Sequence, residues 1–300
     1  MTAEITYVNG LPDNGYLMKF LNRLKTSVRE NRSLLCVGLD PNLDLLPASL
    51  KASGLPAIEQ VREFCLKVID STRSACAAYK PNIAFFEALG PSGIHLFEEI
   101  LKEIPDDKVI IADAKRGDID STSKHYKKAF FDYYDVDALT LNPLMGFDTL
   151  APFLEDEQRA VYTLVLTSNP GSADLLTRPF EGFDSLSEYL ATKLADINRS
   201  SSTHIGMVIG ATHNRQAKPV LNAYPDACLL IPGVGTQGGS MESLRSLLSG
   251  HRGIPLISSS RSIIYAGSED EEWEAAVEES AERSRKALMP ITSDWLGGDS

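Results

Sequence analysis

The chain has 300 residues, of which 43% are hydrophobic and 23% are charged, and its net charge at pH 7 is −12. These values are ordinary for a globular protein with a full hydrophobic core. The sequence has no apolar run long enough for a transmembrane helix and no signal-peptide pattern, so we expect a cytoplasmic protein. The negative charge argues against broad electrostatic binding to nucleic acid or to an anionic membrane. An anionic ligand would therefore need a few well-placed positive groups.

Short apolar runs, typical of strands that are buried on both faces, recur at regular intervals along the chain. We expect eight strands, at residues 34–40, 77–80, 109–115, 138–142, 161–167, 205–211, 227–232 and 255–260. Segments with helical spacing accompany them, most clearly at residues 16–31, 57–76, 185–200 and 271–288. This alternation predicts an α/β fold, a (β/α)8 TIM barrel with an extra N-terminal helix, as a single domain over residues 1–300. The longest irregular stretch, 167–185, has the length of a mobile loop over a site.

The four cysteines lie among apolar residues, and none forms a CxxC pair; they are Cys36, Cys65, Cys76 and Cys228. A disulfide or metal set is one interpretation. We favour buried, reduced thiols, as expected in a reducing compartment, and we predict no metal site.

Polar residues end almost every predicted strand. In a (β/α)8 barrel the active site lies at the carboxyl ends of the strands. The candidates in chain order are Asp40, Lys80, Asn82, Asp113, Lys115, Asp118, Asn142, Thr167, Ser168 and the segments 232–239 and 258–262. A single such residue could belong to any surface loop, but a ring of them predicts an active site.

The last two strand ends predict a phosphate site. The segment "PGVGTQGG" (232–239) offers backbone N–H groups and the Gln237 side chain, and it leads into a predicted helix N-terminus. Arg261, after the eighth strand, can bind a phosphate with two hydrogen bonds. Phosphate sites after strands seven and eight are common in this fold. The alternative is two tight turns and a surface arginine.

The stretch "IIADAKRGDIDST" (110–122) ends a buried strand in alternating charge. Asp113 and Lys115 are two residues apart and therefore face the same way, and Lys80 from the neighbouring strand can reach them. With Asp118 they would form an array in which each acid has a cation beside it and stays ionised. An inert salt-bridge network is the alternative, but such networks add little stability, so we favour catalysis. Arg116 would point the opposite way and is interpreted as structural.

The segment "DAKRGDI" (113–119) resembles the catalytic motif of the orotidine 5′-phosphate decarboxylase family, in the form often called type 2. Other segments resemble that family in the same order: "GLDPN" (38–42), "KPNIAFFEALG" (80–90), "TSNPGS" (167–172), "VIGAT" (208–212) and "PGVGTQGG". The resemblance covers residues from about 34 to 266.

The resemblance implies a cofactor-independent carboxy-lyase that converts orotidine 5′-monophosphate (OMP) to uridine 5′-monophosphate (UMP), the last step of de novo UMP biosynthesis. Lys115 would donate the proton to C6 of the pyrimidine. Asp113 would lie against the substrate carboxylate and orient the lysines, and Lys80 would bridge Asp113 and the ribose. Asp118 and Thr122 would reach the partner's site across a homodimer interface.

The remaining matched residues would bind the other parts of the substrate. They are Asp40 and Asn82 for the ribose hydroxyls, Ser168 with Thr167 for the pyrimidine edge, and Gln237, Gly238 and Arg261 for the phosphate. The implied partners are the nucleotide and a second copy of the chain, without cofactor, metal, nucleic acid or membrane.

Two other functions stay open. Metal-dependent sugar-phosphate decarboxylases and aldolase-like synthases on the same barrel share a D-x-K-x-x-D pattern, although Lys80 and "TSNPGS" favour the nucleotide enzyme. A non-catalytic barrel that binds a nucleotide phosphate would keep Gln237 and Arg261 and could lose the charged array. A longer natural polypeptide, with a fused phosphoribosyltransferase, also stays open.

Overall fold

The computed structural model describes residues 7–8, 11–12, 19–210, 214–233, 241–269 and 272–297. Two short strands near the N-terminus, β1 (Tyr7–Val8) and β2 (Leu11–Pro12), pair antiparallel. All eight predicted strands are present, each within two residues of its predicted ends. They are β3 (Leu35–Leu39), β4 (Ala78–Pro81), β5 (Val109–Arg116), β6 (Ala138–Leu141), β7 (Ala160–Leu166), β8 (His204–Ile209), β9 (Leu229–Pro232) and β10 (Pro255–Ser259).

Helices follow the strands in the order that parallel β-α units require. The longer ones are α1 (Phe20–Asn31), α3 (Ala57–Thr72), α5 (Gly90–Glu103), α6 (Asp120–Lys127), α8 (Leu186–Asn198), α9 (Asn214–Ala223), α10 (Met241–Leu248) and α12 (Trp273–Gly297). The short ones are η1 (Leu43–Leu45), α2 (Ala48–Lys51), α4 (Ile83–Glu87), η2 (Lys128–Tyr133), η3 (Phe147–Phe153), α7 (Ser172–Leu175) and α11 (Arg261–Ile264). The predicted loop 167–185 therefore contains one short helix, α7.

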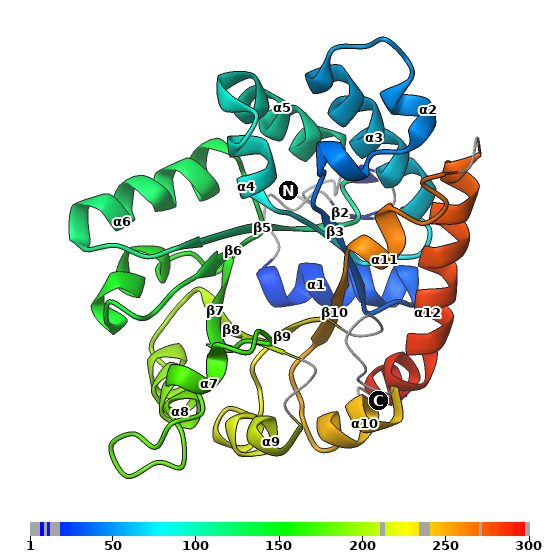
Figure 1. Ribbon diagram of the computed structural model, residues 1–300. Coiled ribbons are helices and arrows are strands. Elements are labelled where there is room, and N and C mark those ends of the chain that lie inside the picture. The colour runs from blue at the N-terminus through cyan, green and yellow to red at the C-terminus, as the bar shows by residue number, and fades with distance from the viewer. Residues whose placement is uncertain are drawn as a thin grey trace, which may run out of the picture.

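The eight strands form a closed parallel barrel in the order β10-β3-β4-β5-β6-β7-β8-β9 (Figure 1). Chain order and spatial order agree, and helices surround the barrel, so the prediction of a (β/α)8 barrel is confirmed. Because neighbouring strands are parallel and nearly in register, their carboxyl ends meet at one rim.

The extra N-terminal helix α1 closes the opposite end of the barrel, where Figure 1 shows it crossing behind the strands. Its residues bond to the segments that enter successive strands. Ser27 Oγ donates to the Ala77 carbonyl before β4 at 2.7 Å, and an Arg23 Nη donates to the Lys108 carbonyl before β5 at 3.0 Å. The Phe20 amide donates to the Glu157 carbonyl before β7 at 3.0 Å. A ligand must therefore enter from the carboxyl ends.

The four cysteines are free and buried, as predicted. Burial raises the pKa of Cys36, Cys76 and Cys228 to about 12 and raises that of Cys65 further still. These thiols are therefore structural. Among the helices that the structure describes, none combines the length and apolar character needed to cross a bilayer.

Candidate active site

Lys80, Asp113 and Lys115 meet at the carboxyl-end rim of the barrel. Lys80 on β4 donates to Asp113 Oδ2 at 2.8 Å, and Lys115 on β5 donates to Asp113 Oδ1 at 2.5 Å. Lys80 and Asp113 are buried, whereas Lys115 is exposed on the open side. The predicted clustering of these three side chains is confirmed, with one carboxylate held between two ammonium groups.

A β-bulge in β5 gives Lys115 its position. The register between β5 and β6 shifts between Ala112 and Arg116, so the amides of residues 114 and 115 lose their ladder partners. The hydroxyl oxygen of Thr140 on β6 accepts both amides, at 3.0 and 2.9 Å, and the hydroxyl donates to Asp113 Oδ1 at 3.1 Å. Lys115 has a φ of 49°, which side chains other than glycine rarely adopt and which is typical of functional positions.

The electrostatics of the array follow from its burial and pairing. Burial alone would raise the pKa of Asp113, but the charges of Lys80 and Lys115 hold it well below its ordinary value. Burial alone would lower the pKa of Lys80, but Asp113 and then Asp40 raise it above its ordinary value. The Lys80–Asp113 pair therefore stays ionised at neutral pH.

Of the predicted ribose ligands, Asp40 follows the neighbouring strand β3, and Asn82 follows β4, the strand that carries Lys80. Asn82 forms a parallel bridge with Asp113 and caps α4, where its side-chain oxygen accepts the amide of Ala84 at 3.3 Å. The carbonyl of Asp40 accepts the hydroxyl of Tyr265 at 2.6 Å, and that hydroxyl oxygen accepts the amide of Asn42 at 2.6 Å. Tyr265, which sequence reasoning missed, thus fixes the turn that carries Asp40.

Asp118 and Thr122 lie farther along the loop and helix that follow β5. An Oδ of Asp118 accepts the amide of Ile119 at 2.8 Å, and Thr122 is exposed on α6. Within the described part of the chain, no ion pair joins Asp118 to either lysine of the array. Their predicted reach into a partner's site therefore stays a prediction.

Thr167 and Ser168, the predicted pyrimidine ligands, begin the loop after β7. Thr167 donates to the side-chain oxygen of Asn169 at 2.7 Å. Gly210, after β8, packs so closely on Ser168 that an added Cβ would lie 2.7 Å from its backbone nitrogen. The absence of a side chain at position 210 thus allows the two strand ends to approach.

Arg261, the predicted phosphate ligand of strand eight, is exposed at the start of α11, directly after β10. Gln237 and Gly238 lie outside the described residues. Arg116 points away from the array, as predicted: its guanidinium pairs with Glu87 at 2.6 Å and lies 5.2 Å from the ring centroid of Tyr126.

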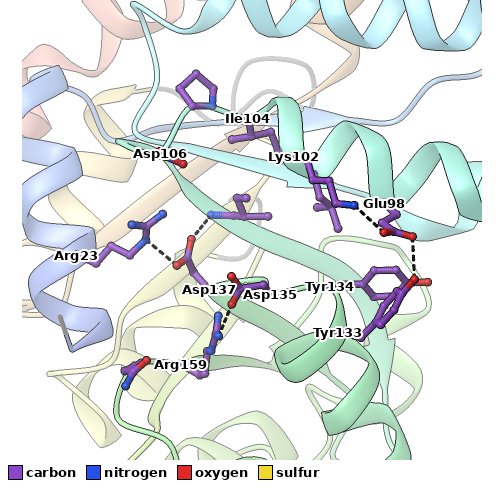
Figure 2. Close-up of a pocket in the computed structure, with 14 residues that line it drawn as sticks. Arg23, Glu98, Lys102, Ile104, Asp106, Tyr133, Tyr134, Asp135, Asp137 and Arg159 are labelled. Carbon is purple, nitrogen blue, oxygen red and sulfur yellow. Dashed lines mark hydrogen bonds and ion pairs between the residues drawn. The ribbon is translucent and has the colours of Figure 1, made fainter. Parts of the chain in front are cut away.

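A cavity of about 580 Å³ lies near the amino ends of β5, β6 and β7, on the side opposite to the array (Figure 2). Three ion pairs join charged side chains that line it: Arg23 with Asp137 at 2.6 Å, Arg159 with Asp135 at 2.5 Å, and Lys102 with Glu98 at 2.7 Å. The Arg23–Asp137 pair attaches α1 to the barrel, and the Lys102–Glu98 pair lies within α5, which favours a structural role over a catalytic one.

A second cavity, of about 500 Å³, lies beside Thr167 between the loops after β6 and β7. Its walls are mostly apolar and include Leu164 of β7, Leu175 of α7 and Phe180. The loop 167–185 thus forms an apolar wall next to the predicted pyrimidine ligands.

Comparisons with known proteins give consistent results. The profile of the orotidine 5′-phosphate decarboxylase / HUMPS family matches residues 33–276. Orotidine 5′-phosphate decarboxylase of Dehalococcoides mccartyi (strain CBDB1) is 40% identical over 275 residues, which cover 90% of this chain and 97% of that protein. Leishmania donovani OMP decarboxylase has a similar structure, with a TM-score of 0.77 and 30% identity, covering 92% of this chain and 99% of that one. Leishmania donovani UMP synthase matches with a TM-score of 0.76 and 31% identity, covering 93% of this chain but 56% of that one.

Proposed function

The chain belongs to the orotidine 5′-phosphate decarboxylase / HUMPS family, and we infer from this membership and from the Lys80–Asp113–Lys115 array that it decarboxylates OMP to UMP in pyrimidine biosynthesis. It is a carboxy-lyase, like the relatives that it resembles over most of their length. The observation that carries the proposed mechanism is the buried carboxylate of Asp113 held between two lysines at the open rim.

Decarboxylation breaks the bond between C6 and the substrate carboxylate, and the bonding electron pair stays on C6. We propose that the Lys115 ammonium transfers a proton to C6, which gives UMP, and that the neutral amine regains a proton from water. As the bond breaks, negative charge moves away from Asp113 and toward Lys115. Fixed charges in this order stabilise the transition state more than the ground state.

The bulge in β5 supports this assignment, because Thr140 and Asp113 hold the backbone and the side chain of Lys115 in place before substrate arrives. Lys80 would join Asp113 to the ribose. The other parts of OMP would bind the residues predicted for them: Asp40 and Asn82 the ribose, Ser168 with Thr167 the pyrimidine edge, and Gln237, Gly238 and Arg261 the phosphate. No step of this proposal uses a cofactor or a metal ion.

We further propose that the enzyme is a homodimer in which Asp118 and Thr122 complete the partner's site. Exposed apolar side chains at this rim support the proposal, since Ile119 is 59% and Leu144 is 68% exposed. Their loops are adjacent, because Gly117 packs against the Asn142 carbonyl. A cytoplasmic location and a single catalytic domain over residues 1–300 also remain part of the proposal.

The test is the loss of absorbance as OMP is converted, with EDTA present, for the wild type, Lys115→Ala and Lys124→Ala. Lys124 is a matched control, because it is an exposed lysine whose ion pair in the described part of the chain is with Asp120 of its own helix. We expect turnover in the wild type and the control, and none in Lys115→Ala. A folded wild type without turnover would overturn the proposal and would favour a sugar phosphate with magnesium as the next substrate to try. Full activity of Lys115→Ala would overturn the role of Lys115 alone.

A further inference from the structure

The buried polar atoms that have no hydrogen-bond partner among the described residues include Asp40 Oδ1 and Ser260 Oγ, which lie at the rim on neighbouring strand ends. Such atoms are uncommon in native proteins, because an unpaired buried polar atom costs roughly 1–3 kcal/mol. Both lie at the end of the barrel that holds the array, since Asp40 follows β3 and Ser260 follows β10. Because both atoms lie at the same rim, we considered whether the two side chains act together.

Gly38, near the end of β3, lets the Ser260 side chain approach this strand closely. A Cβ added at Gly38 would lie 2.8 Å from Ser260 Cβ, 3.3 Å from Ser260 Oγ and 3.4 Å from Asp40 Oδ2. The hydroxyl and the carboxylate therefore both lie close to the same point beside Gly38. Because β3 and β10 are neighbouring parallel strands, this approach is built into the barrel.

Ser260 does not cap the helix that follows it, α11. A serine directly before a helix ordinarily caps it by accepting an amide, but Ser260 makes no such bond to α11. Its side chain lies instead beside Gly38, close to the position where Asp40 Oδ2 also lies. At the other end of α11, Tyr265 holds the carbonyl of Asp40. The turn from Ser260 to Tyr265 thus borders Asp40 on both its backbone and its side chain.

We propose that Ser260 is a positioning residue for Asp40, with its hydroxyl donating to the Asp40 carboxylate when the ribose is bound. The inference rests on the proposed function, in which Asp40 binds a ribose hydroxyl. The donated hydrogen bond fixes the carboxylate orientation and leaves its other lone pairs for the substrate and for the Lys80 charge. Gly38 is part of this arrangement, because any side chain there would clash with Ser260.

The test compares Ser260→Ala with Ser200→Ala by steady-state kinetics on OMP. Ser200 is a control serine, because it is exposed before β8, at the opposite end of the barrel, and its hydroxyl donates to the Ile197 carbonyl at 3.1 Å. We expect Ser260→Ala to lose about ten-fold in kcat/KM, the value for one hydrogen bond to a charged group. The loss should fall on KM, because the ribose contact is made equally in the ground state and the transition state. Thermal melting confirms that each variant is folded.

A double-mutant cycle distinguishes positioning from a general structural role. In an Asp40→Ala background, Ser260→Ala should change kcat/KM by less than about two-fold, since the group that it positions is gone. An undiminished effect in that background, or equal kinetics for Ser260→Ala and Ser200→Ala, would overturn the inference. Both results presuppose a wild type that turns over OMP, so failure of the inference is distinct from failure of the proposed function.

Discussion

Replacing Lys80 and Lys115 by alanine, one at a time, should separate stability from catalysis. Both lysines bind the Asp113 carboxylate, but the Lys80 side chain is 9% exposed and the Lys115 side chain is 49% exposed. Breaking a buried ion pair by removing one partner costs about 3–5 kcal/mol of folding stability. In Lys80→Ala, Lys115 still pairs with Asp113, so we expect a loss near the lower end of this range, at about 3 kcal/mol. Solvent screens the half-exposed pair, so Lys115→Ala should cost about 1 kcal/mol or less. Both variants should lose decarboxylation.

Urea unfolding at pH 7 without ligand measures these free energies, and Lys124→Ala serves again as the exposed-lysine control. The important result is the difference between the two variants. If Lys115→Ala destabilised the fold as much as Lys80→Ala, the assignment of Lys80 to stability and of Lys115 mainly to catalysis would be wrong. An unchanged stability in Lys80→Ala would contradict the assignment of Lys80 and Asp113 as a buried ion pair.

Three further predictions follow from the described contacts. Burial lowers the pKa of His204 to about 4 and also lowers that of His251. The stability that depends on these neutral imidazoles is fully present above their unfolded pKa of about 6.5 and is lost as pH falls, at up to about 1.4 kcal/mol per pH unit for each. His204→Gln should therefore reduce the slope of the free energy of unfolding against pH, measured by urea unfolding between about pH 6.5 and 4.5. The four buried cysteines should not react with a thiol reagent in the native protein and should all react in urea, and rapid native labelling would contradict their assignment as structural thiols. Gly38→Ala should destabilise the fold by about 1–3 kcal/mol, because its Cβ would press against Ser260. Adding Ser260→Gly to this variant should recover part of that stability in urea unfolding, and no recovery would show that another contact causes the loss.

The barrel could be predicted from the sequence because each strand is a short apolar run bounded by polar residues. Strand ends were accurate to within two residues, but helix ends were less so. The predicted helix 271–288 continues to Gly297, since Ile291 and the partly buried Trp295 extend its apolar face. The one-turn helices α2 and α11 carry too few residues to show a helical period.

Part of the site could also be predicted, because parallel strands bring their carboxyl ends together. Lys80, Asp113 and Lys115 follow from that rule alone. Thr140 and Tyr265 do not, since each acts on a residue distant in the sequence and each stands in an apolar stretch without a motif of its own. The bulge that turns Lys115 toward Asp113 could not be predicted from the sequence either, because the Thr140 hydroxyl on the neighbouring strand supports it.

Asp113 and Asp137 show why the structure is needed to tell a catalytic acid from a structural one. Both are buried aspartates that bind a basic side chain at an end of a barrel strand. Burial raises the pKa of Asp137 above its ordinary value, because the nearby arginine Arg23 and the Ile110 amide only partly oppose it. The pKa of Asp113 is lowered, because two lysines outweigh the same burial. Only Asp113 is therefore held firmly as an anion at the open rim, where a substrate carboxylate would meet it, while Asp137 lies at the end that α1 closes.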